Sequence, residues 1–384
     1  MKRFSTAAVV GAALVMMASC GSRTGLFGIS GDTGEIPDSS ILPDSPSPPD
    51  ARPDGPLPCK PGRFPFERAI AQLMFVIDRS GSMAFSLDGT QPVGGVLPPG
   101  VLSRWQVLRN GLATAIVPFD ATIAMGAKFY PEVAPPGPGG PDACLTDLGV
   151  GLAPAAGNAT QILDVFDTTD PRGGTPTSEA IRLAAQYLST ARGVARTMIV
   201  ATDGAPNCNP DLDQQTCLCT VTLASGTDVC KEAPVGSNCL DDKGTISVVK
   251  TIFETQKIPV YVLGIGGAEQ PAFLRVLDDM AVAGGRAKPT SPKHYSAQTE
   301  AEMTAALASI SSSVAQCTFL TPSAPTDPSA ITVEINGQRI ARDTTHTNGW
   351  DWVDQAYGTL AFFGPACDAA STQMPDISGV IRCD

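Results

Sequence analysis

The stretch Leu73-Met-Phe-Val-Ile-Asp78-Arg-Ser80-Gly-Ser82-Met83 decides how this chain of 384 residues folds. Its run of consecutive apolar residues predicts a strand that is buried on both faces, as in the middle of a parallel sheet. The chain turns polar where that strand ends, and Asp78, Ser80 and Ser82 then offer one carboxylate and two hydroxyls at alternate positions. Oxygens of this kind suit a hard cation such as Mg²⁺, which prefers octahedral oxygen coordination and keeps some of its waters.

Two later segments complete a candidate metal site. The loop Gly173-Gly-Thr175-Pro-Thr177 supplies another hydroxyl before a predicted helix, and the apolar strand that begins at Thr197 ends in Thr202-Asp203-Gly. Because open α/β sheets place ligands outside the carboxyl ends of their strands, we expect these oxygens to converge on one cation. The candidate ligands are Asp78, Ser80, Ser82, Thr175 and Asp203. The first motif taken alone would also suit a turn that caps the next helix.

The three motifs, in this order, resemble the metal-ion-dependent adhesion site of von Willebrand factor A (VWA) domains, which uses D-x-S-x-S, a G-x-T-type loop and a T-D-G loop. The resemblance covers residues 60–316. It implies Mg²⁺, with Mn²⁺ as an alternative, held directly or through water by the five candidate ligands. It also implies binding rather than catalysis. A Glu or Asp of a protein partner would fill the open position on the metal, and loops 84–101 and 205–243 would supply specificity.

Strands and helices alternate from Cys59 onward, which predicts a doubly wound, mostly parallel sheet with helices on both faces. The expected strands are 70–77, 122–130, 149–153, 197–202, 258–265 and 293–296, and the expected helices are 102–117, 158–166, 177–190, 245–256, 271–283 and 300–315. The last part of the chain differs. Residues 331–335, 359–363 and 379–382 read as strands, Asn336-Gly337 as a hairpin turn, and we expect no helix there.

The N-terminus predicts export and a lipid anchor. Lys2 and Arg3 precede a short apolar stretch that ends in Met17-Ala18-Ser19-Cys20, which resembles a bacterial lipobox. The alternative is an ordinary signal peptide cut near Ala18. The expected organisation is a lipoprotein signal peptide (1–19) with Cys20 lipidated, a disordered Pro/Asp/Ser-rich tether (20–58), a VWA domain with a Cys-rich insertion (59–317) and a small β-rich tail (318–384). This order resembles VWA lipoproteins of environmental bacteria such as myxobacteria.

Charge and cysteine content agree with a bacterial cell-envelope protein, on the outer membrane or the cell surface rather than the inner membrane. The net charge of −12 argues against a nucleic-acid partner, which requires a basic footprint. Apart from Cys20, the cysteines allow up to five disulfides, as expected in an oxidising compartment. The candidates are Cys59, Cys144, Cys208, Cys217, Cys219, Cys230, Cys239, Cys317, Cys367 and Cys383.

We expect a disulfide between Cys59, just before the first strand, and Cys317, just after the last helix. The two ends of a VWA-like sheet lie close together, and some VWA domains carry a bond there. Cys367 and Cys383 remain rival partners for Cys317. A bond to Cys59 would oppose sliding of the last helix and would keep the metal site always competent to bind.

Other chemistry finds less support. The spacing Cys217-Leu-Cys219 fits zinc poorly. We do not expect the carboxylates of the insertion to bind Ca²⁺, because the sequence contains no complete twelve-residue calcium loop there. These carboxylates are Asp211, Asp213, Asp241 and Asp242. We expect no enzyme, because the sequence has neither a nucleophile elbow nor a zinc-protease helix. His294 and His346, like Trp350 and Trp352, read as structural residues. The alternative function is a structural envelope protein in which the metal only stabilises the fold.

Overall fold

The computed structural model describes residues 56–69, 71–132, 141–146, 151–188, 194–221, 229–232, 236–266, 271–371 and 375–383. The predicted signal peptide, Cys20 and most of the predicted tether lie outside these residues. None of the helices in the described ranges combines the length and the apolar character needed to cross a bilayer.

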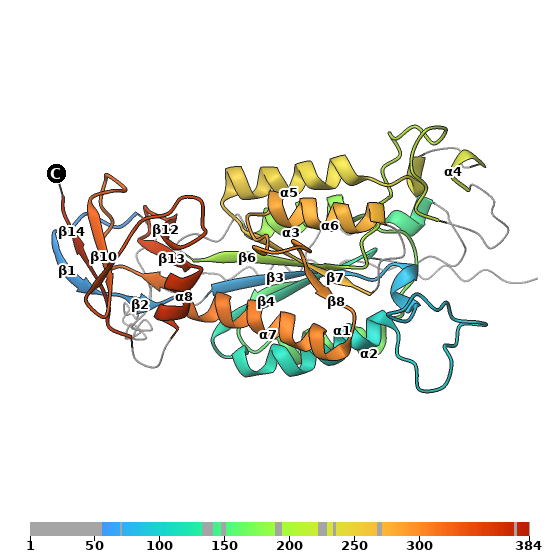
Figure 1. Ribbon diagram of the computed structural model, residues 1–384, viewed down its shortest axis with the longest axis horizontal. Coiled ribbons are helices and arrows are strands. Elements are labelled where there is room, and N and C mark those ends of the chain that lie inside the picture. Colours follow the sequence, from blue (N-terminus) through green and yellow to red (C-terminus); the bar gives the residue numbers. More distant parts are fainter. Residues whose placement is uncertain are drawn as a thin grey trace, which may run out of the picture. The chain divides into compact units, whose positions relative to one another are not determined.

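The central sheet has six strands in the order β5-β4-β3-β6-β7-β8 (Figure 1). Their bounds are β3 Ala71–Asp78, β4 Ile123–Tyr130, β5 Leu152–Ala155, β6 Arg196–Thr202, β7 Val260–Ile265 and β8 Tyr295–Ala297. Neighbouring strands run parallel except β5, which pairs antiparallel with β4. β3 therefore lies inside the sheet between β4 and β6, which explains its uninterrupted apolar run.

Helices cover both faces of this sheet (Figure 1). One face carries α1 Arg104–Ala115, α2 Ala159–Thr168 and α7 Glu300–Gln316, and the other carries α3 Thr177–Leu188, α5 Asp242–Gln256 and α6 Pro271–Ala283. Alternate residues of β3 supply the two apolar cores, Phe75 and Ile77 to the first and Met74 and Val76 to the second. The predicted doubly wound α/β fold is confirmed, and the predicted element bounds move by a few residues.

Shorter helical segments lie in the connections. They are η1 Gly81–Ala84, η2 Val117–Phe119, η3 Pro141–Cys144, α4 Val229–Glu232 and η4 Gly236–Asn238. The chain from η1 to α1 forms an irregular loop. α1 begins only after Ser103, whose hydroxyl and backbone form a reciprocal capping box with Gln106.

Two antiparallel sheets form a separate β-rich module. One has the order β1-β14-β10-β11 and the other β12-β13-β9-β2. The bounds are β1 Gly62–Pro65, β2 Glu67–Arg68, β9 Thr318–Leu320, β10 Ile331–Ile335, β11 Gln338–Ile340, β12 Gly349–Asp354, β13 Thr359–Phe363 and β14 Ile377–Ile381. Both sheets contribute apolar side chains to one core, Val333 from the first and Phe319 and Trp350 from the second. The hairpin at Asn336-Gly337 is confirmed, because Ile335 pairs with Gln338 and both turn residues have positive φ.

The β-rich module differs from the expected tail in two ways. Strands β1 and β2 precede the central sheet in the chain, yet they pair with β14 and β9, so the α/β domain is inserted between β2 and β9. The expected domain 59–317 included these two strands, whereas they pair with strands of the β-rich module. In addition, a short helix, α8 Pro365–Ala370, forms where no helix was expected. Its six residues begin with proline at the first helical position, and such a segment is too short to show a helical period.

The described residues contain five disulfides, and the expected bond between Cys59 and Cys317 is not among them. The pairs are Cys59–Cys383, Cys144–Cys208, Cys217–Cys239, Cys219–Cys230 and Cys317–Cys367. The prediction is wrong because β1 and β14 are antiparallel neighbours, which brings Cys59 beside Cys383. Cys317 instead bonds to Cys367 in α8, one of its two expected rival partners, so no bond to Cys59 restrains the last helix.

Candidate metal centre

The first motif forms a tight polar loop at the end of β3. Asp78 is fully buried. Its Oδ1 accepts a hydrogen bond from the backbone N–H of Ser80 at 2.8 Å, and its Oδ2 accepts one from Thr202 Oγ1 at 2.6 Å. The hydroxyls of Ser80 and Ser82 lie 3.1 Å apart. Ser80 stands at the N-cap of η1, but its side chain makes no capping hydrogen bond, so the hydroxyl is not used as a helix cap.

The second motif lies against this loop. The backbone N–H of Gly81 donates to Gly173 O at 3.1 Å. Thr175, two residues after Gly173, is buried. Asn207 fixes Thr175 from both sides, because its Oδ1 accepts from Thr175 N at 2.7 Å and its own N–H donates to Thr175 O at 2.9 Å. Gly174 faces the Cys144–Cys208 disulfide so closely that an added Cβ would lie 2.6 Å from Cys208 Sγ. Only glycine fits there.

The third motif ends the neighbouring strand β6. Asp203 is almost buried, with 4% of its side chain exposed, and its Oδ2 accepts a hydrogen bond from Arg104 Nη1 at 2.9 Å. The same Arg104 nitrogen lies 3.5 Å from the carbonyl oxygen of Ser82, so Asp203 is tied to the loop after β3. β3 and β6 are the strands at which the order of the sheet reverses, which is where open α/β sheets hold ligands.

The electrostatics of these residues favour a cation. Burial, together with the negative charge of Asp203, raises the pKa of Asp78 to about 7. Burial, again with a contribution from Asp78, also raises the pKa of Tyr130 at the end of β4 well above its usual range. The two carboxylates and three hydroxyls that these three loops carry are an oxygen donor set that fits a hard divalent ion better than a soft one. The residues present therefore fit the Mg²⁺ that the resemblance implies.

The sequence-based prediction missed several contributions to this site. Thr202 was part of the T-D-G motif, but its hydrogen bond to Asp78 was not predicted. Asn207 lies just beyond the third motif, and Tyr130 ends the predicted strand 122–130, outside all three motifs. Arg104, at the start of the helix that follows the first motif, was not singled out.

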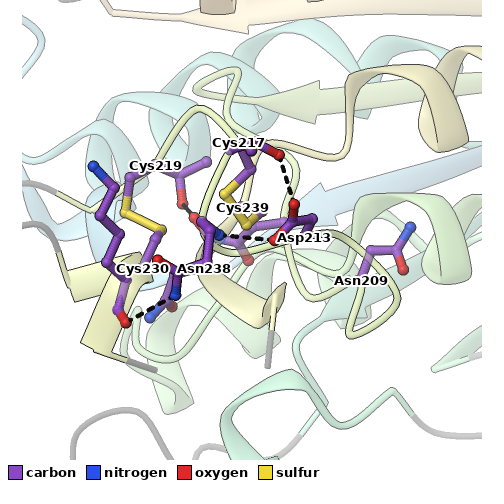
Figure 2. The surroundings of a disulfide bond; sticks show 12 residues. Asn209, Asp213, Cys217, Cys219, Cys230, Asn238 and Cys239 are labelled. Atoms are coloured by element: carbon purple, nitrogen blue, oxygen red, sulfur yellow. Dashed lines mark hydrogen bonds between the residues drawn. A yellow bond between two sulfur atoms is a disulfide. The ribbon is translucent and has the colours of Figure 1, made fainter. Parts of the chain in front are cut away.

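The cysteines of the insertion form disulfides in the structure and not a zinc site. The Sγ atoms of Cys217, Cys230 and Cys239 lie within 4.8 Å of one another. Cys217 is bonded to Cys239, however, and Cys230 to Cys219, so two adjacent disulfides explain the close sulfurs (Figure 2). Bonded sulfurs are not the thiolates that zinc requires.

A cavity of about 480 Å³ lies beside this insertion, against the first turns of α5 and α6. Its lining includes Asn209, Asp213, Asp241, Arg275 and Asp279, but none of the five candidate ligands. Two of its carboxylates have protein partners: Asp241 Oδ1 accepts from Asn209 Nδ2 at 2.9 Å, and Asp213 accepts from the backbone of Gln215.

The remaining candidates have structural surroundings. His294 Nδ1 lies 2.7 Å from Asp278 Oδ1, and His346 stacks on Phe363 with ring centroids 4.2 Å apart. Trp350 is buried, and its Nε1 donates to Ile340 O at 3.1 Å. Packing therefore accounts for Trp350, as predicted.

No family model and no curated protein matches the chain. Among solved structures, the chain is similar to the PilB minor pilin from Streptococcus sanguinis (18% identity, 64% of this chain and 61% of that one, TM-score 0.42). It is also similar to an aerotolerance-related membrane protein from Bacteroides fragilis (15%, 62% and 96%, TM-score 0.39) and to manganese-loaded Plasmodium vivax TRAP protein (13%, 65% and 76%, TM-score 0.37). The match spans about three fifths of the pilin's length.

Proposed function

We propose that this chain is a cell-envelope lipoprotein whose VWA domain binds a protein partner through Mg²⁺, or through Mn²⁺ in its place. The observation that carries the proposal is the convergence of three polar loops, which follow β3, precede α3 and follow β6, at the reversal point of the sheet. Asp78, Ser80, Ser82, Thr175 and Asp203 would hold the ion directly or through water. The partner would contribute a Glu or Asp side chain to its open position.

The loop after η1 supports a role in recognising the partner. An antiparallel β-bridge between Ser86 and Ser103 closes this loop, and its tip carries Val93 and Val96, both exposed. Residues 89–102 contain no charged side chain, in a chain with 17% charged residues. Exposed apolar side chains beside a polar site are typical of protein–protein contact.

The proposed activity is binding and not catalysis. Among the described residues, both histidines pair with carboxylates away from the five ligands, Asp278 and Asp351, and neither reaches the metal centre. A hydrolytic reading needs a base beside the metal. Burial raises the pKa of the Asp78 carboxyl, but Asp78 is itself a proposed ligand.

Affinity capture from a bacterial envelope fraction tests the proposed function. The wild-type chain should retain a partner in Mg²⁺ and lose it in chelator, and Asp78→Ala should capture nothing in either buffer. Asp167→Ala, which removes an exposed carboxylate on α2, is the matched control and should behave like wild type. Equal capture by wild type and Asp78→Ala would reject the metal-dependent site.

The lipid anchor requires its own measurement. Intact mass and N-terminal sequence of the mature protein should show an acylated Cys20. Because a single acyl chain binds membranes only weakly, we expect more than one chain on this residue. A mature N-terminus elsewhere, without acyl mass, would reject the anchor and leave the metal site unaffected.

The alternative is a structural role, in which the ion only offsets the charge of Asp78 and Asp203. The raised pKa of Asp78 is compatible with this alternative, because a bound cation would offset the cost of burying that carboxylate with or without a partner. The two functions differ in one result. Under the structural alternative, Mg²⁺ raises the melting temperature but does not change the amount of partner that is captured.

A further inference from the structure

We infer that Arg104 is a built-in counter-cation of the metal centre, which holds Asp203 and lowers the affinity of the free protein for Mg²⁺. This inference rests on the proposed function and adds a residue that sets how tightly the site takes its ion. Arg104 acts through Asp203 and is a positioning residue.

The ion pair between Arg104 and Asp203 is buried. Arg104 Nη1 lies 2.9 Å from Asp203 Oδ2, with only 3% and 4% of the two side chains exposed. The next arginine on the same helix, Arg109, also pairs with an aspartate, Asp167, but those side chains are 34% and 54% exposed. Water screens the outer pair, whereas the inner pair interacts at low dielectric and therefore strongly.

The side chain of Arg104 is also held in place by its surroundings. The backbone N–H of Arg104 donates to Phe85 O at 2.7 Å, and its Cζ lies 5.8 Å from the centre of the Phe85 ring. On another side, a Cβ added to Gly266 would lie 2.7 Å from Arg104 Nε. Because of these close contacts, we do not expect the Arg104 side chain to move away when an ion binds.

The charge of the guanidinium also opposes a second cation. A divalent ion would share Asp203 with Arg104 and would sit close to a like charge, both of which weaken binding. A carboxylate from the partner would offset this positive charge, so the ion and an acidic partner should strengthen each other's binding.

Calorimetric titration of the full chain with Mg²⁺ tests the inference. Arg104→Gln, which removes the charge and keeps hydrogen-bonding capacity, should bind Mg²⁺ at least about tenfold more tightly than wild type. Arg104→Lys keeps the charge and should stay within about threefold of wild type. The matched control, Arg109→Gln, should leave the affinity unchanged.

A second measurement keeps the test decisive if Arg104→Gln is unstable. In chelator this variant should melt below Arg109→Gln, because Asp203 then lies buried without its counter-charge. Excess Mg²⁺ should restore its melting transition, since the ion would supply the missing positive charge. Failure of Mg²⁺ to restore it overturns the inference, as does unchanged or weaker Mg²⁺ binding by a folded Arg104→Gln. Absence of Mg²⁺ binding by wild type would instead reject the proposed function itself.

Discussion

Thr202 Oγ1 donates a hydrogen bond to Asp78 Oδ2 at 2.6 Å, and this contact joins the ends of two adjacent parallel strands inside the core. The carboxylate is fully buried, and its other oxygen is already engaged by the backbone of Ser80. Thr202 therefore fixes the orientation of Asp78 at the candidate metal centre.

Replacing Thr202 with valine keeps the shape of the side chain and removes this donor. A hydrogen bond to a charged group contributes roughly 1.5–3 kcal/mol, so Thr202→Val should lower the free energy of unfolding by about that amount at pH 8. Mg²⁺ affinity should also fall, because Asp78 loses its orienting partner. Denaturant unfolding and calorimetry measure the two effects. Thr251→Val, on the exposed side of α5, is the control and should change neither by a measurable amount. Wild-type affinity in Thr202→Val would show that Asp78 needs no such support.

The Cys144–Cys208 disulfide should support metal binding, because it packs against Gly174 beside the Thr175 loop. We expect the double variant Cys144→Ala/Cys208→Ala to bind Mg²⁺ several-fold more weakly. The control is Cys317→Ala/Cys367→Ala in the β-rich module. Its cysteines are 50 residues apart, so it should lose about 2–4 kcal/mol of stability yet keep its Mg²⁺ affinity. If both double variants bind Mg²⁺ equally well, the disulfide near Thr175 has no role at the site.

The parts of the fold that follow from local pattern could be predicted. The uninterrupted apolar run of β3 marks it as a strand buried on both faces, and the expected helix 300–315 is present as α7, which Thr299 caps by accepting from Glu302 N. The three metal motifs each end or precede a regular element. The sheet topology then brings them together, which the order of strands and helices already implies.

The parts of the fold that depend on pairing between distant segments could not be predicted from the sequence. Strand β2 has two residues, and its partner β9 lies about 250 residues further along the chain, so no local signal marks the pair. The error at Cys59 follows from the same cause, since its partner is set by the pairing of β1 with β14. Arg104 was missed because nothing in a sequence shows that a charged residue is buried against a carboxylate distant in the chain.

Stability should depend on pH through His294. Burial lowers the pKa of its imidazole, against the opposing effect of the hydrogen bond to Asp278. The folded state therefore binds fewer protons than the unfolded state below the ordinary histidine pKa of about 6.5. The stabilising contribution is fully present above that pH and is lost as the pH falls toward the lower, folded-state value. The raised pKa of Asp78 acts in the opposite direction over the same pH range, so the contribution of His294 is measured as a difference. The melting temperature of wild type, relative to that of His294→Gln, should fall between pH 7.5 and pH 5. A difference that rises over this range would contradict the assigned direction.

The exposed tip of the loop after η1 should contact the partner without supporting the ion. Val93 and Val96 are 86% and 70% exposed, and they exchange two backbone hydrogen bonds of 3.0 and 3.2 Å across Gly94 and Gly95. Both glycines have positive φ, as a tight turn of this type requires, so the tip is held in shape by its backbone. Serine at both valine positions would leave these hydrogen bonds intact and remove only apolar surface.

We therefore expect Val93→Ser/Val96→Ser to keep the melting temperature and the Mg²⁺ affinity of wild type, and to bind the partner captured in Mg²⁺ at least about tenfold more weakly. Burying one valine side chain contributes on the order of 1.5 kcal/mol, so the loss of two such contacts suffices for this change. Val282→Ser on α6, which removes a valine that is 58% exposed on a different element, is the control and should bind like wild type. Unchanged partner binding would remove the tip from the interface. Weakened Mg²⁺ binding would instead mean that the loop supports the metal centre, because serine at the tip changes no charge and no backbone hydrogen bond.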